Sequence, residues 1–145
     1  MGRRNGATIA FDQPEVTPTD ESMIFTLVKS SSFTPGNYWP LNGDDGTQHA
    51  AASTIADGSA TVMPVAGTFR NLIVNGTGIV ALVTNTITVY KNGVATSLTA
   101  TIAIGQQTAS NTTAFFTCAA NDLISIRYAA GNDYGPIAIS CEFTP

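Results

Sequence analysis

The stretch from Asn85 to Ile104 constrains the fold more than any other part of the sequence, because it predicts a β-hairpin. Polar and apolar side chains alternate over residues 86–90, and they alternate again over residues 96–104. Asn92-Gly93 lies between the two runs and is the preferred pair for a two-residue type I′ turn, in which both residues need a positive φ. The pattern is typical of two antiparallel strands with one buried face.

The Asn92-Gly93 turn also predicts the register of this hairpin. Counting outward from the turn places Ile87 opposite Leu98 and Val89 opposite Thr96. One face is then mostly apolar and the other is rich in hydroxyl groups. The same period-two reasoning, applied to each candidate strand, predicts the centre of the core. The predicted core residues are Phe69, Ile87, Leu98, Ile126 and Ile139.

Short apolar or alternating runs separated by turn residues recur along the rest of the chain. Besides the hairpin, the predicted strands are Ser22–Val28, Val62–Val65 with Phe69–Val74 (a strand pair or one kinked strand), Ile79–Val83, Thr113–Cys118, Leu123–Tyr128 and Ile137–Phe143. Residues 34–60 read as a long loop, and no stretch has a helical period. About eight strands at this spacing predict an all-β fold, an antiparallel β-sandwich with jelly-roll topology.

The composition favours a protein that packs against other subunits. Charged residues make up 11% of the 145 residues, against roughly a quarter in average soluble domains. A hydroxyl-rich, weakly charged surface is easily desolvated, and the net charge of -4 argues against nucleic acid as a partner. No apolar run approaches the roughly 20 residues that span a bilayer, so we expect no membrane partner. Nor does Arg3-Arg4 lead into an apolar signal segment, which indicates synthesis in the cytoplasm.

Residues 1–21 are predicted to form an extended N-terminal arm, and residues 22–145 the β-sandwich domain. The arm is polar and interrupted by prolines, so we do not expect it to belong to a core. Ordering it would cost backbone entropy that only a partner surface could offset. Its apolar anchors are predicted to be Ile9, Phe11 and Val16. Arg3 and Arg4 are predicted to meet acidic groups on the partner.

The single histidine, His49, invites a catalytic interpretation that the sequence does not favour. Asp44, Asp45 and Ser53 lie nearby, but proximity within one loop does not establish the geometry of a hydrolytic triad. Asn42, Asp44 and Asp45 could offer oxygens to calcium, yet their spacing misses the calcium-loop pattern. A solvated, glycine-rich loop is the simpler interpretation. We therefore expect no catalytic residue, no metal site and no cofactor.

Two other sets of residues admit both a structural and a functional interpretation. Cys118 and Cys141 could form a disulfide if their strands pair, or they could be two buried thiols of a protein made in a reducing compartment. Asn75 and Asn111 begin glycosylation sequons but are more simply turn residues.

The Tyr38-Trp39 pair is the one aromatic pair in a predicted loop. It could stack on a sugar ring, or it could plug the end of the sandwich or a subunit interface. We favour the plug, because no cluster of acids and amides accompanies the pair.

Four segments of the sequence resemble a known family. They are Tyr38–Gly43, Val62–Leu72, Thr88–Gly93 and Ala120–Ile126. In this order they resemble small jelly-roll modules, similar to the tumour-necrosis-factor type, of bacteriophage virion proteins and related particle-surface proteins. The resemblance covers residues 33–145 and leaves the arm unexplained. It implies a homotrimer that serves as a capsid decoration or a fibre tip, and it implies no catalytic residues.

These observations together predict a structural protein and not an enzyme. We expect a capsid decoration or cement protein on the surface of a phage virion, which binds the major capsid protein and bridges coat subunits as a trimer. The arm, with Tyr38 and Trp39, would make the contacts to shell or neighbouring subunits. The alternative is a receptor- or glycan-binding tip of a tail fibre or spike, although the chain has no coiled-coil or collagen repeat before residue 33.

Overall fold

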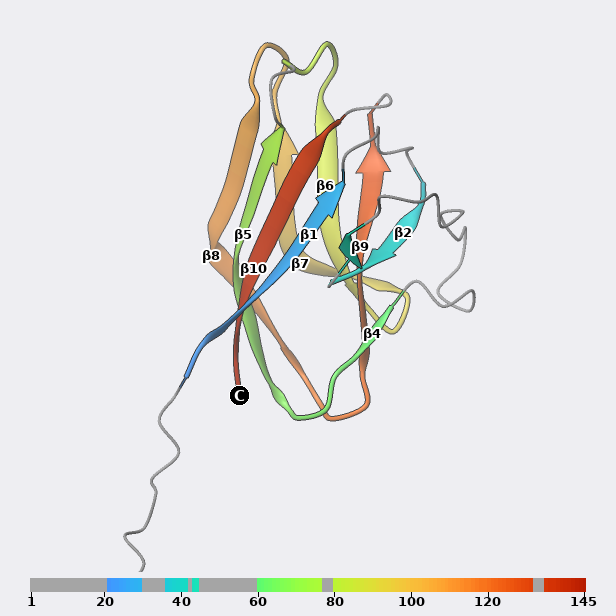
Figure 1. Ribbon diagram of the computed structural model, residues 1–145, viewed down its shortest axis with the longest axis vertical. Coiled ribbons are helices and arrows are strands. Elements are labelled where there is room, and N and C mark those ends of the chain that lie inside the picture. The colour runs from blue at the N-terminus through green and yellow to red at the C-terminus, as the bar shows by residue number, and fades with distance from the viewer. Residues whose placement is uncertain (1–20, 30–35, 42, 45–59, 77–79, 132–134) are drawn as a thin grey trace, which may run out of the picture.

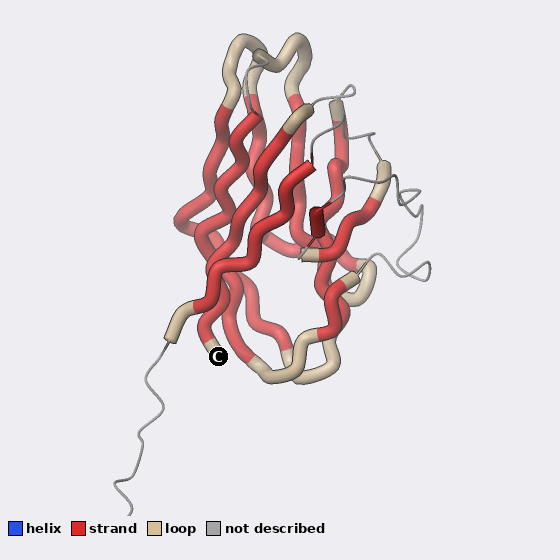
Figure 2. The backbone as a smooth tube through the Cα atoms, viewed as in Figure 1, coloured by secondary structure: helices blue, strands red, loops and turns tan. Residues whose placement is uncertain are grey.

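The computed structural model describes residues 21–29, 36–41, 43–44, 60–76, 80–131 and 135–145, which form ten strands and no helix (Figures 1 and 2). The strands are β1 (Met23–Lys29), β2 (Tyr38–Pro40), β3 (Gly43–Asp44), β4 (Thr61–Val62), β5 (Gly67–Gly76), β6 (Asn85–Lys91), β7 (Val94–Ile102), β8 (Thr108–Cys118), β9 (Leu123–Ala130) and β10 (Ile137–Thr144).

The strands form two sheets that face each other across one core (Figure 1). Sheet I has the order β3-β1-β10-β5-β8, and sheet II has the order β2-β9-β6-β7 with β4 also paired to β9. From β4 to β10 the chain changes sheet after every strand except within the β6–β7 hairpin. This alternation is that of a jelly roll, so the predicted antiparallel β-sandwich with jelly-roll topology is confirmed. The short β1–β3 pair is parallel.

The prediction that residues 62–65 and 69–74 form a strand pair or one kinked strand is wrong. β4 pairs with β9 in sheet II, whereas β5 lies between β10 and β8 in sheet I. Residues 63–66 carry the chain from one sheet to the other. Pro64 lies in this crossing, where it has no ladder hydrogen bond to donate.

The hairpin turn has the predicted geometry. Asn92 has a φ of 50° and Gly93 a φ of 82°, as a type I′ turn requires. Lys91 pairs with Val94 and Tyr90 with Ala95, as counting from the turn predicts.

Beyond Tyr90 the predicted register is wrong by two residues. Ile87 lies opposite Ala100 instead of Leu98. The cause is a bulge in which the Thr96 hydroxyl donates to the Val89 carbonyl at 2.7 Å and accepts from the Leu98 amide at 3.2 Å. A side chain thus replaces part of the backbone ladder. Because the shift is an even number, Ile87 and Leu98 still face the same core.

The strand predicted over Ile79–Val83 is absent, since residues 80–84 form no strand and Ile79 lies outside the described residues. Of this run Ala81 is buried, whereas Leu82 is exposed. The Ala81 amide donates to the Gln106 carbonyl at 2.9 Å, and the Gly105 amide donates to the Ala81 carbonyl at 2.8 Å. The apolar run therefore forms a loop fastened to the β7–β8 loop.

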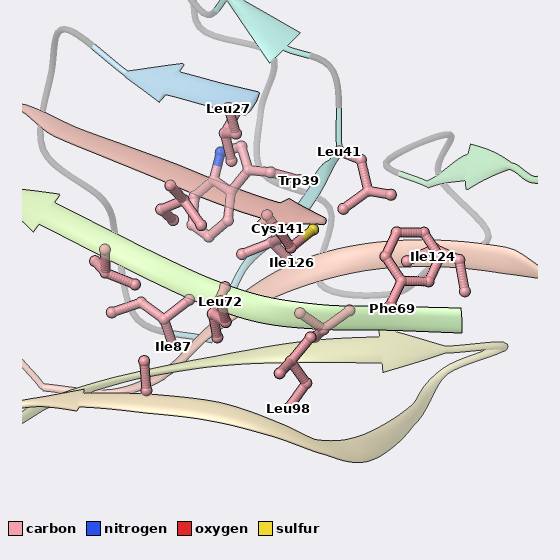
Figure 3. Close-up of a cluster of buried hydrophobic side chains, with 14 of the residues drawn as sticks. Leu27, Trp39, Leu41, Phe69, Leu72, Ile87, Leu98, Ile124, Ile126 and Cys141 are labelled. Atoms are coloured by element: carbon pink, nitrogen blue, oxygen red, sulfur yellow. The ribbon is translucent and has the colours of Figure 1, made fainter. Parts of the chain in front are cut away.

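The core contains all the residues predicted to form its centre. Phe69, Ile87 and Leu98 are fully buried, and Ile126 is 1% exposed (Figure 3). Ile139 is fully buried as well. Phe69 anchors an aromatic cluster, since its ring stacks on Phe116 with centroids 5.1 Å apart and contacts Phe143 at 4.8 Å. Truncation of such residues typically costs about 2–5 kcal/mol.

Both cysteines are buried free thiols, so of the two interpretations the structure shows the buried thiols and not the disulfide. Cys118 ends β8 and Cys141 lies in β10. Burial raises the pKa of Cys141 to about 12 and also raises that of Cys118. Burial therefore disfavours the thiolate, which is the nucleophilic form, at both positions.

Candidate functional site

Several residues predicted from the sequence lie outside the described residues. They are Arg3, Arg4, Ile9, Phe11 and Val16 of the arm, and Asn42, Asp45, His49 and Ser53 of the long loop. Their contact roles stay predictions. Among the residues that the structure describes, no three His, Cys, Asp or Glu side chains gather as metal ligands would. The described residues include no helix with the length and apolar character that a membrane-spanning helix needs.

Tyr38 and Trp39 point to opposite faces of β2. The Trp39 side chain is 3% exposed and belongs to the core of its own chain (Figure 3). Tyr38 lies on the outer face of sheet II, edge-on to Tyr90 with ring centroids 5.2 Å apart. The two neighbours therefore differ: a sugar or a subunit could contact Tyr38, whereas Trp39 is covered.

Arg127 joins the two tyrosines. Its guanidinium carbon lies 5.2 Å from the Tyr38 ring centroid and 5.6 Å from that of Tyr90, and Nη1 donates to the Tyr90 hydroxyl at 3.0 Å. The hydrogen bond to Tyr90 raises the pKa of Arg127. Through these contacts Arg127 of β9 links β2 to β6 on the outer face of sheet II.

The outer face of sheet I has a different character, because it exposes large apolar side chains. The strand register places three rows of residues across β1, β10, β5 and β8. The rows are Ile24-Glu142-Arg70-Phe115, Thr26-Ser140-Ile73-Ser110 and Val28-Ala138-Asn75-Thr108. We call these residues the sheet I face. Ile24 is 65% exposed and Phe115 63%, and Val28 and Ile73 are also exposed.

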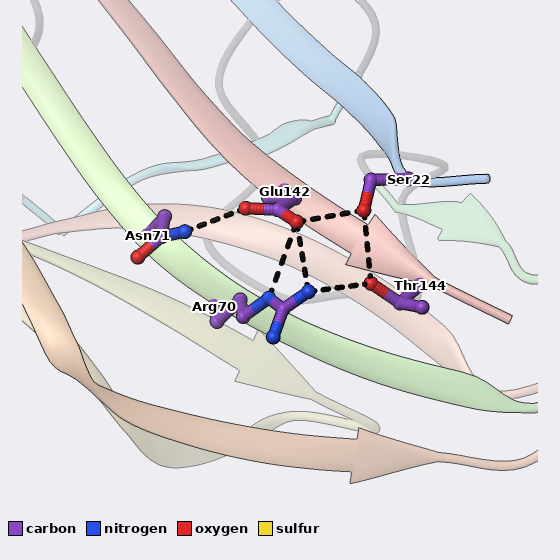
Figure 4. Close-up of polar contacts among 5 residues, drawn as sticks. All are labelled: Ser22, Arg70, Asn71, Glu142 and Thr144. Atoms are coloured by element: carbon purple, nitrogen blue, oxygen red, sulfur yellow. Dashed lines mark hydrogen bonds and ion pairs between the residues drawn. The ribbon is translucent and has the colours of Figure 1, made fainter. Parts of the chain in front are cut away.

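The two charges of this face neutralise each other within one network (Figure 4). Arg70 donates to Oε1 of Glu142 from Nε at 3.2 Å and from Nη2 at 2.9 Å. Ser22 donates to the same oxygen at 2.7 Å, and Asn71 donates to Oε2 at 2.5 Å. These bonds lower the pKa of Glu142, and the bond from Ser22 has the largest effect. Both charges of the face are therefore compensated before any partner arrives.

A bulge in the pairing of β5 with β8 forms a depression in the sheet I face beside Phe115. Leu72 pairs with Asn111 and Arg70 with Phe115, so residues 112–114 of β8 oppose Asn71 alone, which has a φ of 55°. The Asn111 side chain accepts from the Ala114 amide at 2.9 Å, which holds the bulge. The result is a shallow pocket of about 300 Å³, lined by Thr68, Arg70, Thr112, Thr113, Ala114 and Phe115.

Phe115, Arg70 and Glu142 were not predicted as site residues from the sequence. For Phe115, however, the sequence does indicate an exposed position. In the run Ala114-Phe115-Phe116 one of the two adjacent aromatic rings must face outward in a strand. The pairing of Arg70 with Glu142 could not be found this way, because 72 residues separate the two. Around them charge is scarce, since Lys91 is the one charged residue between Asn71 and Asn121.

Comparison with known proteins adds little to this description. No protein-family model matches the chain, and no curated protein matches it either. Among solved structures it is similar to the native structure of a family 35 carbohydrate-binding module from Clostridium thermocellum, with a TM-score of 0.40 and 10% identity over 84% of this chain and 90% of that one. A similarity of this size carries no argument about function.

Proposed function

We propose that this protein is a non-catalytic structural protein that functions by packing the sheet I face against other copies of itself. One observation carries this proposal: the face exposes Ile24, Val28, Ile73 and Phe115, and its charged pair is already neutralised. Exposed apolar patches mark interaction sites, and the centres of protein interfaces are poor in unpaired charge. Contact with a second such face would desolvate apolar and hydroxyl groups at little electrostatic cost.

The finer proposal is a homotrimer on a virion. The four segments that resemble phage jelly-roll modules support it, and so does a weakly charged composition suited to permanent contacts. In this proposal the protein decorates or cements the capsid of a phage, binds the major capsid protein and bridges coat subunits. It would be made in the host cytoplasm and take no cofactor. The arm would supply contacts to the shell.

The alternative proposal is a receptor- or glycan-binding tip, and the pocket beside Phe115 is the observation that favours it. An exposed aromatic ring next to an arginine and several hydroxyl groups offers one apolar surface and a few polar groups, which ligand sites combine. A sugar ring could occupy a pocket of about 300 Å³. In a trimer built through the sheet I face, this pocket would be covered.

The two proposals are separated by substitution at the centre of the face. Ile73→Glu places an unpaired carboxylate where two apolar surfaces would meet, so we expect the oligomer to dissociate to monomers in sedimentation-velocity ultracentrifugation. Val94→Glu is the matched control, because Val94 is an exposed aliphatic residue at the hairpin turn of sheet II. Circular dichroism checks that both variants are folded.

A wild-type protein that is monomeric at micromolar concentration, or an Ile73→Glu variant that stays oligomeric, would overturn self-association through this face. Binding of neutral or acidic oligosaccharides to wild-type protein but not to Phe115→Ala, measured by calorimetry, would favour the alternative.

A further inference from the structure

The edge of sheet I at β1 is only partly covered. β3 pairs with Leu27 and Val28 of β1. Within the described residues, no strand pairs with Met23–Thr26 on that side, since β10 occupies the other. Backbone amides and carbonyls in such an edge form a template for another strand. No charged residue interrupts Met23–Thr26, although charges are the usual protection of an exposed edge.

The opposite side of the sandwich contrasts with this open edge. There the edge strands β7 and β8 are joined by hydrogen bonds from side chains to backbone carbonyls. Ser97 of β7 donates to the Phe115 carbonyl at 2.8 Å, and Asn111 of β8 donates to the Thr99 carbonyl at 2.8 Å. At the same side Lys91, the last residue of β6, donates to the Thr117 carbonyl of β8 at 3.1 Å. These bonds occupy backbone carbonyls between β7 and β8, which leaves fewer of them free for a further strand on that side.

One side chain that packs against the core lies at the β1 edge. Phe25 points inward, with its ring centroid 5.7 Å from that of Phe69 and 6.0 Å from that of Phe143. It is nevertheless only partly buried, whereas Phe69 and Phe143 are fully buried. Its neighbours Met23 and Ile24 are exposed. A strand added beside β1 would cover the open side of this ring with its own inward side chains.

We propose that residues 7–11 of a second copy of the chain add to the β1 edge as a strand. The segment Ala7-Thr8-Ile9-Ala10-Phe11 has Ile9 and Phe11 in one phase of a period-two pattern. These two side chains would lie over Phe25, and Thr8 and Ala10 would face outward with Ile24 and Thr26. The proposal deepens the proposed function and rests on its self-association.

A second copy fits this edge better than the arm of the same chain. Pro14 and Pro18 lie between the segment and Ser22, and prolines favour an extended path over a tight return. Ser22 is held by Glu142 at the start of β1 (Figure 4). An extended link of this length reaches about 35 Å, enough to cross to a neighbouring subunit. An exchange that runs head to tail can close a ring of subunits.

Disulfide trapping tests the strand exchange and its phase. Chains carrying Ala10→Cys and chains carrying Ile24→Cys or Thr26→Cys are co-expressed with tags of different mass. Outward-facing residues on paired strands have Cβ atoms about 5 Å apart, so oxidation should link the two chain types. Ile9→Cys is the matched control, because it points inward and should give no link to these partners. The native thiols are buried and do not compete.

Disulfides between chain types with Ala10→Cys, and none with Ile9→Cys, are the expected result. Absence of any link between chains would overturn the proposal, as would equal linking from both positions. A link confined to one chain in an Ala10→Cys/Thr26→Cys double variant would assign the segment to its own copy and also overturn it.

Deletion of residues 1–11 separates this inference from the proposed function. We expect the deletion to leave the circular dichroism spectrum unchanged and to weaken the oligomer by about tenfold or more in dissociation constant. If Ile73→Glu dissociates the oligomer while the deletion and the cysteine pairs do nothing, the sheet I face stands and the strand exchange fails. If the cysteine pairs link while Ile73→Glu stays oligomeric, the strand exchange is supported and packing through the sheet I face is overturned.

Discussion

Asn92 stabilises two turns, its own and the one between β8 and β9. Its φ is positive, and its backbone amide donates to the Leu123 carbonyl at 2.8 Å. Its side chain donates to Asp122 at 2.7 Å and accepts from the Leu123 amide at 2.8 Å. Asp122 in turn accepts from the Ala119 amide, and these bonds lower its pKa. One asparagine therefore makes its own turn and fastens it to the β8–β9 turn.

Gly93→Val should lower the free energy of unfolding by about 1 kcal/mol or more, because a β-branched side chain resists the φ of 82° that Gly93 adopts. Urea denaturation followed by circular dichroism measures the change. Val94→Ala, at the exposed neighbouring position, is the control and should have little effect. Equal stability of Gly93→Val and wild type would contradict the type I′ assignment.

At the scale of elements, β10 is the central strand of sheet I. Its inner side chains Ile137, Ile139, Cys141 and Phe143 are all buried. Its outer face carries Glu142, which receives hydrogen bonds from Ser22 beside β1 and from Arg70 and Asn71 of β5 (Figure 4). One carboxylate thus links three neighbouring segments of the sheet.

The lowered pKa of Glu142 predicts a pH dependence of stability. A carboxylate whose pKa falls on folding stabilises the protein above its unfolded pKa, about 4.3, and the stabilisation disappears as the pH falls through the folded value. Glu142→Gln should therefore be less stable than wild type near pH 7, and the difference should shrink toward about pH 3. Urea midpoints at the two pH values measure this. Glu21→Gln, at an exposed position before β1, is the control. If the difference in stability between Glu142→Gln and wild type does not change with pH, the charge of Glu142 is not its cause.

At the scale of the whole molecule, the distribution of charge governs how copies can meet. Lys91 is the one charged residue between Asn71 and Asn121, a stretch that contains β6, β7 and β8 and most of β5. The charged pair on the sheet I face is satisfied within the chain. Association through this face would then depend on desolvation of apolar groups and not on charge pairs between subunits.

Self-association should consequently be insensitive to salt. Raising NaCl from about 0.05 M to about 1 M shortens the screening length several-fold, yet we expect the dissociation constant to rise less than about threefold. Sedimentation equilibrium at several salt concentrations measures it. A loss of affinity of about a hundredfold would indicate that charge pairs between subunits hold the oligomer together.

The sequence by itself determined the local structure. Period-two alternation located most strands and chose the buried side of each, because the side chains of a strand alternate whatever it pairs with. Ile87, Leu98 and Ile139 were predicted to be buried on that ground, and they are. Asn92-Gly93 determined its own turn, since the demand for positive φ is local.

Only the tertiary structure decided which strands pair, where the ladders slip and which outer face stays open. The Thr96 hydroxyl shifts the hairpin by two residues, and residues 80–84 become a loop because the β7–β8 loop bonds to Ala81. β4 and β5 separate into different sheets, and Arg70 meets Glu142 across β5 and β10. Each outcome depends on a partner distant in the sequence, and alternation within one strand carries no information about that partner.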